Sequence, residues 1–304
     1  MTLEQQVFGT TFQNPVLLAS GTCGYGEELD ELFDLDRLGG LVTKAVTLEP
    51  RSGNPSPRVA EFDAGMLNSI GLANVGLESF RTEKLPWLRQ RLSNTRVFVN
   101  VAGKSVEEFC RIVEVLEPDQ GFLGFELNLS CPNVKDGALF STREDLLSAV
   151  VRQARSLTRR PILAKLAPNV PDIGRMAEVA VAAGADGLTL INTVPGLLFD
   201  LESRQPVLGA GAGGVSGAAI LPLGVHAVHQ VRRRVSVPII GAGGIRTAHD
   251  AAQYLYAGAS LLAIGTATFA DPRTGLRVIS ELSRLGNRLG ATSITELVGA
   301  GRLN

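Results

Sequence analysis

A single cysteine, Cys131, stands in the segment 126–133 (Glu-Leu-Asn-Leu-Ser-Cys-Pro-Asn), just after an apolar run typical of a strand. A thiol at the open end of a sheet can lose its proton and then take one from a substrate. The chain has 3 histidines, all in stretches that we expect to be helical, so the usual proton-transfer side chain is poorly placed. An arbitrary cysteine is more often a small buried thiol. Cys131 is therefore a candidate general base that needs support from the rest of the sequence.

Polar side chains and glycines follow the other apolar runs at the points where those runs end. These residues are Ser20, Gly21, Lys44, Asn100, Asn128, Lys165, Asn192, Thr193, Gly243, Gly244, Gly265 and Thr266. Neutral amides and lysines suit a planar, electron-rich, hydrogen-bonding ligand better than a metal. No cluster of His, Asp and Glu has the spacing of metal ligands, so we expect no metal site. The Gly-rich turns at 241–244 and 265–266 offer backbone N–H groups to a phosphate.

Eight short apolar runs alternate with amphipathic stretches, a pattern that predicts alternating strands and helices. We expect strands at 16–20, 40–46, 97–102, 122–129, 162–166, 187–192, 238–241 and 261–265. We expect helices at 27–38, 75–92, 105–116, 143–157, 172–183, 217–234, 247–257 and 273–289. Strands that are apolar on both faces and joined by helices form a covered parallel sheet. Eight such units favour an α/β fold with a single closed (β/α)8 barrel, the TIM barrel, whose catalytic residues lie at the carboxyl ends of the strands.

The composition is that of a globular protein with one large core. Of 304 residues 45% are hydrophobic, and no linker divides the chain, so we predict one domain over 1–304. The net charge of −1 argues against nucleic acid as a partner. We find neither a run of about 18 apolar residues nor a signal-peptide pattern, and we expect no membrane association. The 3 cysteines are too far apart for a disulfide framework, which favours a cytoplasmic location.

One motif is misleading. The segment 209–214 contains the pattern G-x-G-x-x-G, which in a strand–turn–helix context indicates a dinucleotide site. The residues before it, 200–206, are polar and include a proline, so they do not predict a strand. We expect a flexible loop here that leads to Ser216 and Gly217.

Five segments resemble the class 1 dihydroorotate dehydrogenases. They are 41–45, 53–58, 66–72, 128–133 and 238–244, and the resemblance extends over essentially the whole chain. Cysteine rather than serine at position 131 separates the sequence from the membrane-associated class 2 enzymes, whose N-terminal helix is also missing. The residues around 53–72 and 131–135 are most similar to the NAD-linked 1B subclass.

The resemblance implies an FMN-containing barrel that oxidises (S)-dihydroorotate to orotate in pyrimidine (UMP) biosynthesis. Cys131 would take the C5 proton while hydride leaves C6 for the flavin, and Lys44 would lie between flavin and substrate. Lys165 would face the N1–O2 edge of the flavin, where a cation stabilises the reduced ring. The loop 132–142 would act as a lid that excludes water.

The resemblance also implies the residues that contact each ligand. The substrate would contact Lys44, Asn68, Ser69, Ile70, Gly71, Leu72, Asn128, Asn192 and Thr193. The flavin would contact Ser20, Gly21, Lys44, Ala45, Asn100, Asn128, Lys165, Ile191, Gly217, Gly243, Gly244, Gly265 and Thr266. Cys23, Ala218 and the Gly- and Ala-rich segment 208–214 depart from the family pattern.

The electron acceptor needs a second protein under this interpretation. The sequence has neither a nicotinamide-binding fold nor four cysteines for an iron–sulfur cluster. Reduction of NAD would therefore require a subunit that carries FAD and a [2Fe–2S] cluster, joined to a homodimer of this chain. The alternatives are a fumarate-linked 1A-like enzyme, another FMN barrel that acts on pyrimidines, a non-redox phosphate-binding isomerase or lyase, and a barrel that binds flavin without catalysis.

Overall fold

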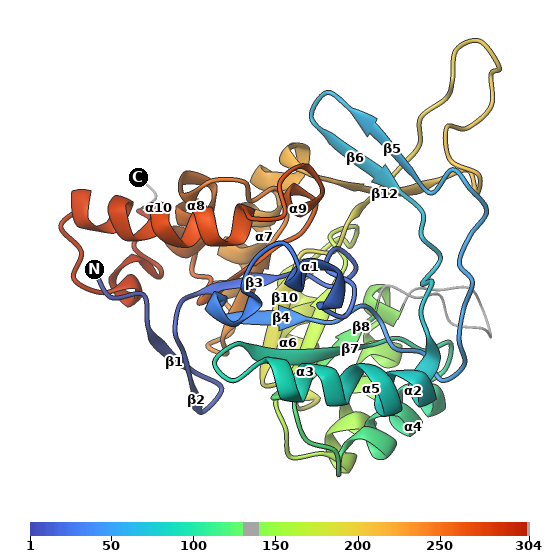
Figure 1. Cartoon of the computed structure of the whole chain (residues 1–304), viewed down its shortest axis with the longest axis horizontal. Coiled ribbons are helices and arrows are strands. Elements are labelled where there is room, and N and C mark those ends of the chain that lie inside the picture. Colours follow the sequence, from blue (N-terminus) through green and yellow to red (C-terminus); the bar gives the residue numbers. More distant parts are fainter. Residues whose placement is uncertain (130–139, 303–304) are drawn as a thin grey trace.

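The computed structural model describes residues 1–129 and 140–302. Its centre is a closed barrel of eight parallel strands surrounded by helices (Figure 1). In chain order the barrel strands are β3 (Val16–Leu18), β4 (Gly40–Val42), β7 (Arg96–Val101), β8 (Gly124–Asn128), β9 (Ile162–Leu166), β10 (Gly187–Leu190), β13 (Ile239–Ala242) and β14 (Leu261–Ile264). Each overlaps one of the eight expected strands, so the predicted (β/α)8 barrel is confirmed. That 1–304 forms one domain stays a prediction.

Helices that follow the barrel strands surround the barrel. They are α1 (Glu27–Asp30), α2 (Gly76–Ser79), α3 (Leu85–Arg91), α4 (Val106–Leu116), α5 (Glu144–Leu157), α6 (Ile173–Ala182), α7 (Leu221–Arg232), α8 (Ala248–Ala257), α9 (Ala267–Ala270) and α10 (Thr274–Arg288). The expected helix at 27–38 is broken, because the Asp34 side chain accepts a hydrogen bond from the backbone of Asp36 and starts a separate 3-10 turn, η1 (Leu35–Arg37). No described helix is long and apolar enough to cross a membrane.

Alternation along the strands divides their side chains between two cores. On β3, Val16 and Leu18 pack outward against the helices, whereas Leu17 packs inside the barrel. The inner core also contains Phe98 and Leu163, and it is joined by the N-terminal hairpin of β1 (Gln5–Val7) and β2 (Thr10–Phe12). Two residues further along their strands, at Asn100 and Lys165, the inward positions become polar while remaining buried. The barrel interior is therefore apolar at one end and polar at the other.

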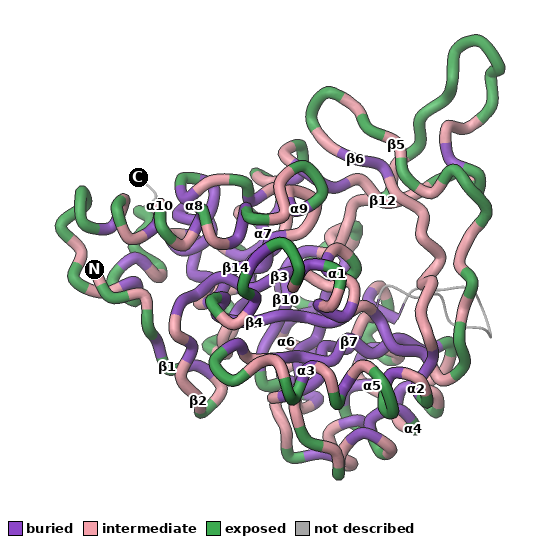
Figure 2. Tube along the Cα trace, in the orientation of Figure 1, coloured by how far each residue is buried: buried purple, intermediate pink, exposed green. Residues whose placement is uncertain are grey.

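A four-stranded antiparallel sheet stands off from the barrel and was not expected from the sequence (Figure 1). Its order is β11 (Val194–Gly196), β12 (Gly213–Ser216), β6 (Gly65–Asn68) and β5 (Val59–Phe62). Buried residues dominate the barrel strands in Figure 2, whereas the outer sheet and the segment beyond it are largely intermediate or exposed.

The outer sheet corrects one expectation about the glycine-rich segment. Residues 213–216 form β12 rather than part of a flexible loop, with Gly214 paired to Asn68 on β6. A Cβ on Gly213 would lie 2.4 Å from the Asn68 carbonyl oxygen, so this close pairing requires glycine. Because the last two glycines of the motif, Gly213 and Gly214, lie within this strand and not in a turn between a strand and a helix, the segment also lacks the context of a dinucleotide site.

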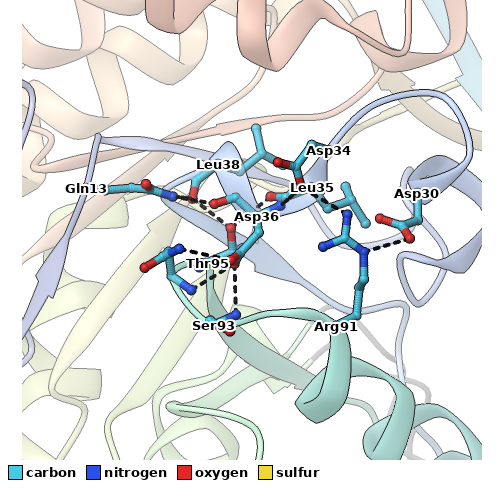
Figure 3. A network of polar contacts seen from close by, with 10 residues as sticks. Gln13, Asp30, Asp34, Leu35, Asp36, Leu38, Arg91, Ser93 and Thr95 are labelled. Carbon is cyan, nitrogen blue, oxygen red and sulfur yellow. Dashed lines mark hydrogen bonds and ion pairs between the residues drawn. The ribbon is translucent and has the colours of Figure 1, made fainter.

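A polar network joins the segments that precede β4 and β7 (Figure 3). The Asp36 carboxylate accepts hydrogen bonds from the backbone N–H groups of 93, 94 and 95 at 2.9, 2.8 and 2.9 Å. Arg91, at the end of α3, forms ion pairs with Asp30 at 2.8 Å and Asp34 at 2.9 Å. These contacts join the segments that enter β4 and β7 at their amino ends. In a barrel, that end serves stability rather than catalysis.

Candidate active site

A cavity of about 480 Å³ opens at the carboxyl ends of the barrel strands. One wall is the barrel rim, and the other is formed by the β5–β6 hairpin together with Ser216 of β12. This volume lies in the range of about 300–1,000 Å³ that is usual for small-molecule and cofactor sites. The outer sheet therefore adds a second wall to the mouth of the barrel, and the pocket between the two walls stays partly open.

Most of the site residues predicted from the sequence meet in this cavity. Its lining includes Ser20, Gly21, Lys44, Ala45, Asn68, Ile70, Leu72, Asn100, Asn128, Lys165, Ile191, Asn192, Thr193, Gly217, Gly243, Gly244, Gly265 and Thr266. The candidate base Cys131 and positions 132–139 of the expected lid lie outside the described residues.

Two predicted substrate residues, Ser69 and Gly71, do not line the cavity. Asn68, Ile70 and Leu72, which alternate with them in the sequence, do line it. Ser69 instead accepts a hydrogen bond through Oγ from the Asn54 amide nitrogen at 2.7 Å. Gly71 turns the chain with φ of 70°, a conformation that glycine adopts readily. Both residues therefore affect the conformation of the segment and do not form the surface of the cavity.

The sequence did not indicate the wall opposite the barrel rim. That wall includes Val59, residues 61–66 and Ser216. Ser216 and Met66 are 150 positions apart, yet the Ser216 hydroxyl donates to the Met66 carbonyl at 3.3 Å. No local pattern signals such a pairing. Ala19 and Ala263 also line the cavity, and their inward positions could have been found from strand alternation.

A buried polar network lies on the barrel strands beside the cavity. Glu126 on β8 is 1% exposed, and its carboxylate accepts hydrogen bonds from Asn100 Nδ2 and Thr189 Oγ1, each at 2.7 Å. The other carboxylate contact is Lys165 Nζ, 3.8 Å away. Lys165 Nζ also donates to Ser20 Oγ at 3.0 Å. Buried charged groups such as Glu126 and Lys165 are tolerated because each has a partner. Sequence reasoning overlooked Glu126, although its position on β8 has the same inward direction as Asn128.

Hydrogen bonds orient the amides at the rim. Asn192 Nδ2 donates to Asn128 Oδ1 at 3.3 Å, and Asn192 Oδ1 accepts from the Thr193 backbone at 2.8 Å. Asn68 Nδ2 donates to the Gly214 carbonyl at 3.1 Å. The Lys44 ammonium, by contrast, lines the cavity without a hydrogen-bond or ionic partner among the described residues. It is available to an anionic group of a ligand.

The two described cysteines are poorly suited to proton transfer. Burial raises the pKa of the Cys23 thiol to about 12, and Sγ lies 3.3 Å from the Val42 carbonyl. Cys110 lies on α4 outside the barrel, and partial burial raises its pKa as well. Neither residue lines the cavity. Among the 3 cysteines of the chain, the candidate base therefore remains Cys131.

Several features of the cavity fit the FMN that the sequence led us to expect. Gly243 and Gly244 have φ of 120° and 75°, conformations that favour glycine. A Cβ on Gly265 would meet no heavy atom closer than 3.6 Å, so this turn leaves open space for a ligand. Asn100 Oδ1 is buried without a hydrogen-bond partner among the described residues. An open glycine turn suits a phosphate, and a buried carbonyl oxygen suits an N–H donor on a ring.

Comparisons with known proteins agree with this geometry. A family model described as dihydroorotate dehydrogenase matches residues 2–285. A protein of Solibacter usitatus (strain Ellin6076), provisionally named dihydroorotate dehydrogenase A (fumarate), is 48% identical over 298 residues, which cover 98% of this chain and 97% of the relative. Proteins of Desulforudis audaxviator and Geobacillus kaustophilus are named dihydroorotate dehydrogenase B (NAD(+)), catalytic subunit. They are 46% and 44% identical and cover 97% and 98% of this chain, with 95% of each relative matched.

Among solved structures, a DHODH of Eimeria tenella in complex with ferulenol matches with a TM-score of 0.83. The match covers 98% of this chain and 88% of that structure at 24% identity, which shows a shared fold. The family model and the relatives extend over nearly the whole described barrel and its cavity. The chain therefore belongs to the dihydroorotate dehydrogenase family.

Proposed function

We propose that this chain oxidises (S)-dihydroorotate to orotate with FMN bound in the cavity, and that the electrons pass to NAD through a partner subunit. The observation that carries the proposal is the meeting of Lys44, Lys165 and the amides of Asn68, Asn128 and Asn192 in one cavity. Amides can pair with the donors and acceptors of a pyrimidine ring, and a free ammonium can pair with its carboxylate. Family membership supports redox chemistry and argues against the phosphate-binding isomerase or lyase.

The barrel rim would hold the cofactor. Gly243, Gly244, Gly265 and Thr266 would contact the FMN phosphate, while Asn100 and Lys165 would contact the ring. FMN, when bound, supplies the acceptor for the hydride that leaves C6 of the substrate. The open turn at Gly265 and the unpartnered carbonyl oxygen of Asn100 support this arrangement.

The protein's own residues would bind the substrate and move the proton. Lys44 would neutralise the substrate carboxylate, and the hydrogen-bonded pair of Asn128 and Asn192 would orient the ring. Cys131 would take the proton from C5, so that loss of this proton and of hydride from C6 leaves a C5–C6 double bond. The role of Cys131 rests on the sequence. The wall formed by β5, β6 and β12 would exclude bulk water from the reacting atoms.

NAD is the favoured final acceptor because several relatives carry that assignment in their names. Two relatives above are named NAD(+)-type catalytic subunits, a term that implies a further subunit. We infer a partner that carries FAD and a [2Fe–2S] cluster, bound to a homodimer of this chain, in the cytoplasm. Fumarate is a second candidate, since the relative at 48% identity is provisionally named for it.

The first test is the visible spectrum of the anaerobically purified protein before and after addition of dihydroorotate. We expect a yellow protein that bleaches promptly. A yellow protein that stays oxidised would contradict the substrate, and a colourless protein that FMN cannot reconstitute would contradict the cofactor. Reoxidation of the bleached chain by fumarate alone would favour the second acceptor. Reoxidation by NAD⁺ only in the presence of the co-purified partner would favour the first.

A further inference from the structure

Glu126 is a buried charged residue of the barrel, and the proposed reaction gives it no role. Its carboxylate does not line the cavity, but it contacts Asn100 and Lys165, which do. We propose that Glu126 is a positioning residue that orients the Asn100 amide and offsets the charge of Lys165, and thereby sets the reduction potential of the flavin. This inference rests on the proposed FMN site.

Glu126 fixes the orientation of the Asn100 amide. An ionised carboxylate only accepts hydrogen bonds, so the Asn100 group that faces Glu126 at 2.7 Å is the NH₂ group. The amide oxygen must then point elsewhere, and it is buried without a partner among the described residues. An unpartnered buried acceptor costs free energy unless a ligand donor satisfies it. Glu126 therefore determines which atom Asn100 presents to the ligand.

The Glu126 carboxylate also offsets the positive charge of Lys165. Two-electron reduction adds negative charge to the flavin ring, and a nearby cation makes reduction more favourable. The Lys165 ammonium has Glu126 at 3.8 Å, and both side chains are almost fully buried, with 9% and 1% exposed. In a region with little water the field of each charge is weakly screened, so the carboxylate cancels part of the field of the lysine. The pair therefore stabilises reduced flavin less than Lys165 alone would.

The strand register makes this arrangement rigid. Asn100 on β7 pairs directly with Glu126 on β8, and Lys165 on β9 pairs directly with Thr189 on β10. Four neighbouring strands of a closed barrel thus supply the four groups, with Thr189 Oγ1 holding the second carboxylate oxygen at 2.7 Å. Groups held on barrel strands keep their distances better than groups on loops.

The experiment is a spectroscopic redox titration of the purified, FMN-loaded Glu126→Gln variant. Glutamine can accept from Asn100 through its oxygen and donate to the Thr189 hydroxyl, so both hydrogen bonds can persist while the negative charge is lost. We expect the flavin potential to rise by about 30 mV or more, a tenfold change in a two-electron equilibrium. FMN affinity should remain close to that of the wild type. An unchanged or lowered potential would overturn the proposal.

Two further variants separate positioning from a structural role. Thr189→Val removes a hydrogen bond to the same carboxylate but keeps its charge, so its potential should stay within about 10 mV of wild type. If Glu126→Gln yields no folded holoenzyme, Glu126→Asp provides the test, because its charge is kept while its carboxylate recedes from Asn100. We expect FMN to bind at least threefold more weakly to Glu126→Asp, in line with one lost hydrogen bond of about 0.5–1.5 kcal/mol. Wild-type FMN affinity of the Glu126→Asp variant would overturn the proposal.

The outcomes distinguish this inference from the proposed function. A wild-type protein that takes up no FMN contradicts the function itself. A wild-type flavoprotein that dihydroorotate reduces, but whose potential does not respond to Glu126→Gln, contradicts only the role of Glu126. A structural role alone would lower the stability of both Glu126→Gln and Thr189→Val and raise the potential of neither.

Discussion

Gly265→Ala should weaken FMN binding without weakening the fold. Gly265 follows β14 and lines the cavity, and its backbone does not have the positive φ that would exclude alanine. An added Cβ would have Ala19 Cβ at 3.6 Å and Thr22 Cγ2 at 3.7 Å as its nearest neighbours, which is ordinary van der Waals contact. Both neighbours line the cavity, so the methyl group would occupy ligand space rather than protein core.

Gly265→Ala should stabilise the folded chain slightly but weaken FMN binding. Replacement of glycine by alanine at a compatible position stabilises a protein by about 0.4–1 kcal/mol, because the unfolded chain loses conformational freedom. An extra methyl group in a closely packed contact costs about 1–3 kcal/mol. If the FMN phosphate lies against Gly265, the variant should bind FMN tenfold or more weakly, since about 1.4 kcal/mol corresponds to a factor of ten.

The assay combines FMN titration of the apoprotein, followed by flavin fluorescence, with thermal unfolding of the same apoprotein. Gly241→Ala is the contrasting variant, because its Cβ would lie 2.5 Å from Tyr254 Cδ1 in the core behind β13. We expect Gly241→Ala to lower the unfolding temperature of the apoprotein and Gly265→Ala to preserve it. Wild-type FMN affinity in a stable Gly265→Ala variant would refute the placement of the phosphate at this turn.

Three further predictions test other parts of the molecule. Lys44→Met should raise the KM for dihydroorotate about tenfold or more, since a hydrogen bond to a charged group contributes about 1.5–3 kcal/mol. The control is Lys104→Met, which changes an exposed lysine. Equal KM values for the two variants would contradict the role of Lys44 in binding the substrate carboxylate. Burial raises the pKa of Cys23 from 9.0 to about 12, so the folded state holds this proton more tightly and the resulting stability is lost as pH rises from 9 to 12. In urea titrations over that range, the wild type should lose stability more steeply than Cys23→Ala, and parallel slopes would argue against this. Asp36→Ala removes the acceptor of three backbone N–H groups and should lower the unfolding free energy by about 2 kcal/mol. Turnover per folded molecule should not change. Lost turnover at wild-type stability would be inconsistent with a purely structural role of Asp36.

The barrel and its rim were predictable from the sequence because they depend on short-range patterns. Buried strands in a parallel sheet are short apolar runs, and helices between them have their own period, so eight strands could be located without long-range information. The catalytic face follows from topology, since all eight strands point the same way. Lys44, Asn100 and Lys165 were therefore assigned to one rim, and the structure places all three in one cavity.

Strand alternation also indicates the inward direction of Glu126. Glu126 is two residues before Asn128 on β8, so both side chains point into the barrel. A carboxylate at an inward position needs donors, and Lys165 on the neighbouring strand was an evident partner. The same rule does not reach Ser69 and Gly71, because β6 ends at Asn68 and both Gly71 and Leu72 have positive φ.

Only the tertiary structure could decide the outer wall of the cavity and the partners of the buried charge. The wall exists because β12 pairs with β6 in a definite register, Ser216 opposite Met66, across 150 residues of chain. Pairing at that separation leaves no periodic signal in either segment, and a glycine-rich strand such as β12 has almost no apolar pattern of its own. The sequence by itself determined the barrel and the polar residues at its rim, because local periodicity governs both. The enclosure of that rim, and the distance from Glu126 to Lys165, depend on packing between segments that the sequence does not bring together.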